Sequence, residues 1–343
     1  MRVTLVLTHD CNLACDYCYT GEKFARSMPE KVAWEALRLA FRQSRTQSER
    51  LCVSYFGGEP LLEFAAMARY TRKAHQWALR HQRPIEFQVT TNATIMSQKI
   101  LDFFQRYPFR IAFSGDGLNT DHDRHRPFVS GRASSPVVWK NLEQAAGKLG
   151  AHIHIVVNPD TLNGLTATIQ RLHELNYRDI TLLPNMDAVW DAASRALARE
   201  VYHSVSELQA EQRELMVSPL IDMELEQPRL KACGFGSDDV AVSPTGALYP
   251  CARLVGTDQR EPLHLGHVKT GVDETKVKTL KARARAKQAG CGSEGGCACA
   301  TFMPGNVIRQ LDNTRFFNEL NLSLAVQNRA LAVAAGSAAT ALL

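Results

Sequence analysis

The sequence predicts an α/β fold in which helices wrap a parallel sheet. Two observations predict this class. Strand-like and helical segments alternate through about the first two hundred residues, and the composition, 45% hydrophobic and 22% charged, is ordinary for a globular enzyme. The alternation amounts to six units of a strand followed by a helix. We therefore expect a sheet that is open or partly closed as a barrel.

The six units follow one another in regular order. The first strand reads RVTLVLT, and the helix after it begins near Pro29, a residue suited to a first helical turn. The expected strands are 2–8, 51–57, 84–92, 109–117, 151–159 and 178–184. The expected helices are 29–44, 61–82, 97–107, 135–150, 162–176 and about 192–215.

Several chemically useful residues fall at or just past the ends of these strands. They are Cys11, Gly57, Asn92 and Ser114. Active sites of α/β sheets lie at the carboxyl ends of the strands. These residues are therefore expected to meet at one edge of the sheet.

Composition and charge exclude several classes of protein. A net charge of +5 over 343 residues is too mild to imply nucleic acid. No apolar stretch approaches the length of a membrane span, and the first residues lack the pattern of a signal peptide. We therefore expect no membrane partner and a cytoplasmic location. In that compartment, nine cysteines indicate metal ligands or catalytic groups rather than disulfides.

The composition changes near residue 225, where Gly, Pro and Cys become frequent and the rhythm of strands and helices is lost. We place a domain boundary there, which gives a first domain at 1–222 and a second at 223–320. The remaining residues, 321–343, are rich in alanine and are expected to form a loosely held helix or a frayed tail.

Three cysteines, Cys11, Cys15 and Cys18, lie within eight residues just after the first strand. A structural zinc ion needs four ligands, and His9 is the only nearby candidate for a fourth. Three thiolates instead leave one iron of a 4Fe–4S cluster without a protein ligand. A small molecule can then bind that iron, while a zinc site or a purely structural cluster remains the alternative.

The C-x3-C-x2-C spacing after a first strand, with the aromatic Tyr17 before the last cysteine, resembles the radical S-adenosylmethionine (SAM) superfamily. The resemblance implies a partial (β/α)6 barrel with SAM in its mouth. It also implies that SAM binds the open iron and is reductively cleaved to a 5′-deoxyadenosyl radical, which abstracts hydrogen from a substrate.

Further stretches resemble SAM-binding motifs of the same family. YFGGEP resembles its GGE motif, in which glycines allow close backbone approach and Glu59 accepts from the SAM ammonium group. TTNAT and FSGDGLNTDHDRHRPFVSG resemble later SAM-contacting stretches. A surface salt bridge is the alternative for Arg126, and ordinary core packing is the alternative for Leu183. The implied cofactor-binding residues are Tyr17, Gly57, Gly58, Glu59, Asn92, Ser114, Asp116, Arg126 and Leu183.

A second cysteine group begins at Cys233, followed after twelve residues by Gly246 and after four more by Cys251. This spacing resembles the opening of the SPASM domain, in which Gly246 would supply a positive φ in a hairpin. The later match is partial, because Gln288 stands where a cysteine belongs and no cysteine follows Cys299.

The resemblance therefore implies one auxiliary 4Fe–4S cluster, as in the shortened twitch version. Cys233 and Cys251 are its surest ligands, and Asp239 is a less favoured oxygen ligand. Zinc remains the alternative metal, and Cys52 is expected to be a small core residue. The cysteines that can complete the site are any two of Cys291, Cys297 and Cys299.

SPASM and twitch proteins mostly modify peptides, so the resemblance implies a peptide or precursor-peptide substrate and an electron donor such as flavodoxin or ferredoxin. Ala252 stands where sulfatase-maturating relatives carry an acidic base, which disfavours formylglycine formation. The early cysteine motif leaves no room for an N-terminal leader-binding domain, so a separate protein or the C-terminal half is expected to recognise any leader.

The basic segment 269–288 is either a docking surface for an acidic peptide or a solvated helix face. Two other functions remain open. One is a radical SAM enzyme that acts on a small molecule in cofactor biosynthesis, and the other is a non-enzymatic iron–sulfur protein.

Overall fold

A computed structural model of the chain describes residues 1–43, 50–212, 214–220, 234–259, 261–290, 298–302 and 307–340. The strands are β1 (Arg2–Thr8), β2 (Leu51–Gly57), β3 (Ile85–Thr91), β4 (Phe109–Ser114), β5 (Ala151–Val157), β6 (Asp179–Pro184), β7 (Met216–Ser218), β8 (Asp239–Val242), β9 (Ala247–Tyr249), β10 (Gly266–His267) and β11 (Gly271–Val272).

Helices α1 to α7 lie between the first seven strands, and α9 and α10 follow β11 in the C-terminal part. They are α1 (Glu30–Gln43), α2 (Phe64–Arg80), α3 (Gln98–Arg106), α4 (Thr120–His125), α5 (Ser135–Ala145), α6 (Leu165–Glu174), α7 (Ala192–Glu211), α9 (Glu274–Gly290) and α10 (Val307–Thr340). Short 3-10 turns are η1 (Pro60–Glu63), η2 (Pro159–Gly164), η3 (Ala252–Leu254), η4 (Glu261–Leu263) and η5 (Ala298–Phe302).

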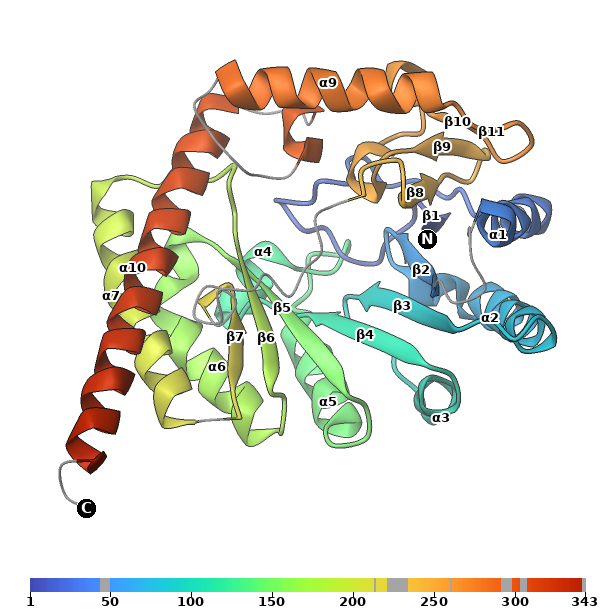
Figure 1. Cartoon of the computed structure of the whole chain (residues 1–343). Coiled ribbons are helices and arrows are strands. Elements are labelled where there is room, and N and C mark those ends of the chain that lie inside the picture. The colour runs from blue at the N-terminus through green and yellow to red at the C-terminus, as the bar shows by residue number, and fades with distance from the viewer. Residues whose placement is uncertain are drawn as a thin grey trace.

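One sheet runs through the described part of the chain in the order β11-β10-β9-β8-β1-β2-β3-β4-β5-β6-β7. Every neighbouring pair from β8–β1 to β6–β7 is parallel. The predicted α/β class and parallel sheet are therefore confirmed, and the helices lie outside the curved sheet (Figure 1). Parallel strands covered in this way are buried on both faces, which is why every residue of β1 except Arg2 is buried.

The C-terminal module joins the barrel through its first described strand. β8 pairs with β1 in parallel, with Arg2 opposite Asp239, so the module continues the sheet beyond β1. β8 and β9 then form an antiparallel hairpin in which Gly246 has φ +93, as the sequence predicted. The expected boundary at 222/223 falls outside the described residues.

The C-terminal helices lie on two sides of the barrel. In Figure 1, α9 runs across the top and α10 descends beside α7. Residue 321, where a loose tail was expected to begin, lies inside α10, and Asn321, Leu324 and Ala325 are buried. The ring of Phe317 meets that of Trp190 edge-on, with centroids 4.8 Å apart. This part of α10 is thus packed against the barrel.

A seventh parallel strand, β7, follows α7 and was not expected, and two helical assignments also differ from the expectation. The segment before α2 starts as η1 because Glu59 caps it and Pro60 follows. The short helix α4 was not expected, because its sequence TDHDRH has no apolar periodicity. Both helical differences lie next to strand ends, where loops are placed by tertiary contacts.

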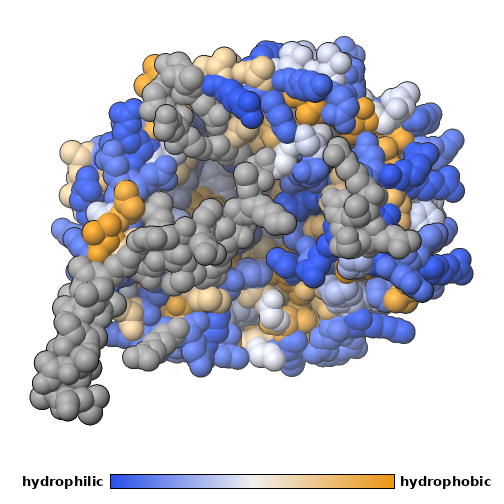
Figure 2. Space-filling model, in the orientation of Figure 1, coloured by the Kyte–Doolittle hydropathy of each residue, from blue (hydrophilic) through white to orange (hydrophobic). Residues whose placement is uncertain are grey.

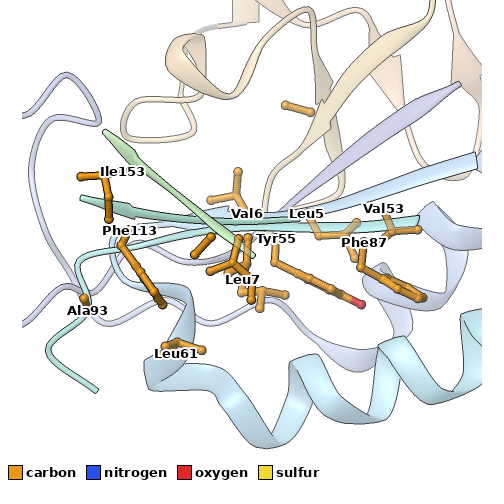
Figure 3. Packing of buried hydrophobic residues seen from close by; sticks show 14 of the residues in the cluster. Leu5, Val6, Leu7, Val53, Tyr55, Leu61, Phe87, Ala93, Phe113 and Ile153 are labelled. Carbon is orange, nitrogen blue, oxygen red and sulfur yellow. The ribbon is translucent and has the colours of Figure 1, made fainter. Parts of the chain in front are cut away.

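The barrel core joins five neighbouring strands. Figure 3 shows side chains of Leu5, Tyr55, Phe87, Phe113 and Ile153, each at most 1% exposed. The rings of Tyr55 and Phe87 lie nearly parallel, with centroids 6.4 Å apart. Burying a side chain of this size contributes about 1.5–3 kcal/mol, so these contacts hold adjacent strands in register.

The face of the molecule that Figure 2 shows is mostly hydrophilic. Figure 2 shows hydrophobic residues on this face in small separate groups among hydrophilic ones. Among the described residues, no helix combines the length and the apolar character that crossing a membrane requires.

Replacing Phe87 with alanine should destabilise the chain by about 3–5 kcal/mol, because the cavity it leaves cannot be refilled. The measurement is the urea midpoint under anaerobic conditions. Leu79→Ala is the control, since Leu79 is 65% exposed. Equal midpoints for the two variants would contradict this account of the core.

Candidate active site

The loop that carries the three cysteines follows β1 and is held on both sides. On one side, the Asn12 Nδ2 donates to Thr94 Oγ1 (2.8 Å) and the Asn92 Nδ2 donates to Asn12 Oδ1 (2.9 Å). On the other, Ala14 N donates to Pro127 O (2.9 Å). The loop after β1 is therefore fixed to the segments after β3 and α4.

The three thiols are half-buried and differ in environment. Burial raises the pKa of Cys15 to about 11 and also raises the pKa of Cys11. At Cys18 burial acts in the same direction but is outweighed by Lys23 and Thr20, so the pKa of Cys18 is lowered. The Lys23 Nζ lies 3.0 Å from Cys18 Sγ, and Asn92 Nδ2 lies 3.8 Å from Cys11 Sγ. Donors thus already face two of the sulfur atoms.

These thiols fit a cluster better than a single ion. Among the described residues, no three His, Cys, Asp or Glu side chains are arranged to hold one metal ion. His9, the only candidate for a fourth zinc ligand, is buried and stacks on Phe24 at 4.5 Å. A cubane binds each cysteine at a different iron atom, so three separated thiols on one loop suit it.

Glu59 ties the end of β2 to the end of β3. Its buried carboxylate accepts from Thr91 Oγ1 (2.7 Å), Asn92 N (2.7 Å) and Leu61 N (2.9 Å). Burial raises the pKa of Glu59, although these donors oppose the rise. A carboxylate has about four acceptor positions, so three are used within the chain and one is left for a ligand.

The two glycines before Glu59 are required by a neighbouring strand. A Cβ on Gly57 would lie 2.3 Å from Thr8 O, and a Cβ on Gly58 would lie 2.1 Å from Asp10 O. Gly57 also has φ +149. These glycines therefore permit close approach to the end of β1 and the start of the cysteine loop. Backbone approach to the methionyl end of SAM, which the resemblance implied, stays a prediction.

Tyr17, Asp116 and Arg126 form one buried group. The Tyr17 hydroxyl donates to Asp116 and accepts from Arg126 Nη1 (2.7 Å), and the Arg126 and Asp116 side chains are 3.5 Å apart. Those two side chains are 8% and 0% exposed. The surface salt bridge considered for Arg126 is therefore wrong, because its ion pair is buried.

Asp116, in the loop after β4, is held by further hydrogen bonds to β5 and α4. Asp116 Oδ1 accepts from Val156 N on β5 (3.1 Å), and Asp116 N donates to His122 Nδ1 (3.3 Å). Burial lowers the pKa of His122 to about 3, so the ring is neutral and can accept this bond. Burial raises the pKa of Asp116, and Arg126 opposes that rise.

The remaining predicted SAM residues lie at strand ends. Asn92 follows β3 and is 6% exposed, and Ser114 ends β4 half-buried. Leu183 lies in β6 and is 41% exposed, so the core alternative for it is wrong.

Sequence reasoning missed a set of polar residues beside the cysteines. His125 lies 2.8 Å from Asp16 and 2.9 Å from Asp160, and the Asn185 Nδ2 donates to Asn158 Oδ1 (2.8 Å). They line a cavity of about 620 Å³ together with Cys18. Asn158 follows β5 directly, as Asn92 follows β3, so the same strand-end rule could have found it.

The second cysteine group is described only in part. Cys251 precedes η3 and Cys299 lies buried in η5, and these two turns pack together. Cys233, Cys291 and Cys297 lie outside the described residues. Asp239 pairs with Arg2 at 3.0 Å, and Cys52 is 6% exposed on β2.

Tyr19 lies between the two cysteine groups. Its ring is 4.8 Å from the Arg253 guanidinium and stacks on Phe56 at 6.2 Å. Tyr19 is 38% exposed, so it lies at the surface where the cysteine loop meets the C-terminal module.

Comparison with known proteins agrees with this geometry. The model of the radical SAM superfamily matches residues 5–172. An uncharacterised protein of Methanocaldococcus jannaschii is 24% identical over 299 residues, which cover 83% of this chain and 93% of that protein.

Two solved structures share the fold over most of the chain. The structure of anSMEcpe with bound AdoMet has a TM-score of 0.73 at 16% identity and covers 93% of this chain and 99% of its own. Streptococcus suis SuiB bound to its precursor peptide SuiA has a TM-score of 0.59 at 14% identity and covers 89% and 73%.

The chain therefore carries a radical SAM domain over residues 5–172. It is a radical SAM enzyme whose fold is that of anSMEcpe and SuiB. The cofactors of such a domain are SAM and a 4Fe–4S cluster, which confirms this part of the sequence prediction.

Replacing Arg126 with alanine should destabilise the chain by about 3–5 kcal/mol, because the buried Asp116 carboxylate loses its counter-charge. Thermal or urea unfolding measures the loss. Arg171→Ala removes two ion pairs at the surface, to Glu143 and Glu174, and should leave the midpoint nearly unchanged. A midpoint that moves no further for Arg126 than for Arg171 would contradict the role of the buried pair.

Proposed function

We propose that this enzyme matures a ribosomally synthesised peptide, using a 4Fe–4S cluster held by Cys11, Cys15 and Cys18. The observation that carries the proposal is the position of these thiols on a fixed loop beside a cavity of about 620 Å³, which Cys18 itself lines. When bound, the cluster supplies the electron that splits SAM into methionine and a 5′-deoxyadenosyl radical.

The residues of the chain hold and orient the reactants. Lys23 and Asn92 face the sulfurs of Cys18 and Cys11 and lower the cost of negative charge there. Glu59 retains an acceptor position for the SAM ammonium group. The further SAM contacts proposed are Tyr17, Gly57, Gly58, Asn92, Ser114, Asp116, Arg126 and Leu183.

We extend the proposal to one auxiliary 4Fe–4S cluster in the C-terminal module. Its support is the packing of η3 against η5, which brings the segments of Cys251 and Cys299 together. Two of Cys233, Cys291 and Cys297 would complete the ligand set. The Asp239 carboxylate already accepts a hydrogen bond from Arg2, which favours thiolates over this carboxylate as ligands of the auxiliary cluster.

A peptide substrate is supported by the peptides bound to the two structural neighbours. SuiB binds a precursor peptide, and anSMEcpe was solved with a peptide as well as AdoMet. The modification is a crosslink, an epimerisation or a related change, since Ala252 disfavours formylglycine formation. An electron donor such as flavodoxin or ferredoxin would reduce the cluster, and a separate protein could present a leader.

The basic segment 269–288 includes the helix α9, and part of its charge is used inside the chain. Lys281 Nζ donates to Ser237 Oγ (2.6 Å), and the Arg283 guanidinium lies 5.7 Å from the Phe302 ring. These contacts engage both side chains within the chain, which speaks against counting Lys281 and Arg283 in a docking surface. Docking of an acidic leader stays a prediction for the rest of the segment.

Replacing Cys11, Cys15 and Cys18 together with alanine should abolish SAM cleavage, because no ligands then hold the cluster. The measurements are 5′-deoxyadenosine release with dithionite and iron content after reconstitution. Cys52→Ala is the matched control, since that buried thiol lies on β2. Retained 5′-deoxyadenosine release in the triple variant would refute the assignment.

Iron content tests the auxiliary site separately. The reconstituted enzyme should hold about eight iron atoms per chain, four for each cubane, and the triple variant should keep about four. One zinc per chain with about four iron atoms would instead establish a zinc site in the module. About twelve iron atoms would establish two auxiliary clusters.

A further inference from the structure

The cavity beside Cys18 is lined by the cysteine loop, the segments after β5 and β6, and residues 256–257 of the C-terminal module. Its volume of about 620 Å³ lies within the usual range for ligand pockets. It therefore brings the barrel and the C-terminal module to one space next to the proposed cluster.

The charge of this cavity is negative. Asp16, Asp160 and Asp187 line it, and the described lining residues include neither Lys nor Arg. Asp16 and Asp160 share His125, and Asp160 also lies 3.6 Å from Arg124. Asp187 differs, because its carboxylate accepts from the neutral amide of Gln310 (2.7 Å).

A buried amide in the same wall has an unused donor. Asn158 is 2% exposed, and its Nδ2 has no partner among the described residues. Its Oδ1 accepts from Asn185 Nδ2, which sets the orientation of the amide. Burying a donor without an acceptor is unfavourable, so a carbonyl group in the cavity would satisfy it.

The loop that carries Asp187 is held in place by α10. The Asn313 Nδ2 donates to Met186 O (3.0 Å) and Ala188 O (3.1 Å), while Gln310 binds Asp187 itself. Asn313 and Gln310 are 1% and 8% exposed. The position of this carboxylate is therefore fixed by buried contacts.

We propose that this cavity binds the peptide substrate and selects a lysine or arginine side chain, with Asp187 as the principal carboxylate and Asn158 donating to a peptide carbonyl. Among the described residues the Asp187 carboxylate forms no ion pair, while Arg309 Nη1 donates to the backbone oxygen of Asp187 (3.2 Å). A carboxylate without an ion pair attracts a cation, and the Asn158 amide donor requires an acceptor. A basic residue of a peptide provides both groups, through its side chain and its carbonyl. The inference rests on the proposed function and specifies its substrate class.

The probe is a synthetic pool of capped hexapeptides, with mixed residues at the central positions. The reconstituted enzyme is incubated with the pool and with S-adenosylhomocysteine, which fills the nucleoside site, and the retained peptides are sequenced by mass spectrometry. Lys or Arg should be enriched at least threefold at one position. In Asp187→Asn the enrichment should fall close to one.

Asp102→Asn is the matched control, because it removes the same charge from an exposed site on α3. It should keep the enrichment. No enrichment of basic residues, or the same enrichment in Asp187→Asn as in Asp102→Asn, would overturn the inference.

Release of 5′-deoxyadenosine with dithionite is measured on the same preparations. Absence of release would overturn the proposed function, whereas release without basic enrichment would overturn only the selection of a basic residue.

Asn158→Asp tests the amide, because it keeps an acceptor for Asn185 and removes the unused donor. Because the substitution also adds a negative charge, the readout is the retention of the uncharged peptides of the pool, which the new carboxylate does not attract. Their retention should fall about tenfold, and Asn176→Asp, in a turn after α6, should leave it unchanged. If S-adenosylhomocysteine binding falls and peptide retention does not, Asn158 belongs to the nucleoside site and its assigned role is wrong.

Discussion

The buried contact between Asp116 and Arg126 connects the parts of the chain that form the site. Asp116 follows β4 and accepts from β5, Arg126 follows α4, and Tyr17 lies between Cys15 and Cys18. Removing either of two opposite charges that are buried away from water is destabilising, because the other charge is left uncompensated. The cysteine loop is therefore held at the sheet edge by an interaction whose loss is costly.

Glu59 provides a second connection of the same kind on the other side of the loop. Two of its three accepted hydrogen bonds join the end of β2 to the end of β3, and Asn92 continues the chain of contacts to Asn12 and Cys11. The glycines before it let the backbone of β2 pass within contact distance of β1. The residues that resemble SAM-binding motifs are thus also the residues that fix the loop of the three cysteines.

The C-terminal half completes the site rather than standing apart from it. β8 extends the sheet from β1, Arg253 packs over Tyr19, and α10 holds the loop of Asp187 through Asn313 and Gln310. The wall of the cavity consequently depends on residues that lie close to opposite ends of the sequence. Its shape and charge are properties of the assembled chain.

Much of the barrel could be predicted from the sequence, because strands buried on both faces must be apolar runs and helices must carry an apolar face. The cysteine spacing similarly indicated the cluster loop, since three ligands on one loop are close in the chain. Helix α4 and the start of α2 were misjudged, because polar capping and strand-end contacts decide them. The cavity residues His125, Asn158 and Asp187 went unnoticed, because single polar residues carry no periodic signal.

The sequence by itself determined the strand order along the chain, the ligand loop and the need for a positive φ at Gly246, because each depends on residues near one another in the chain. Only the tertiary structure decided that Arg126 is buried, that α10 packs beside α7, and that three aspartates face one cavity. Those outcomes depend on contacts between distant segments. Burial and charge pairing are set only when these segments meet.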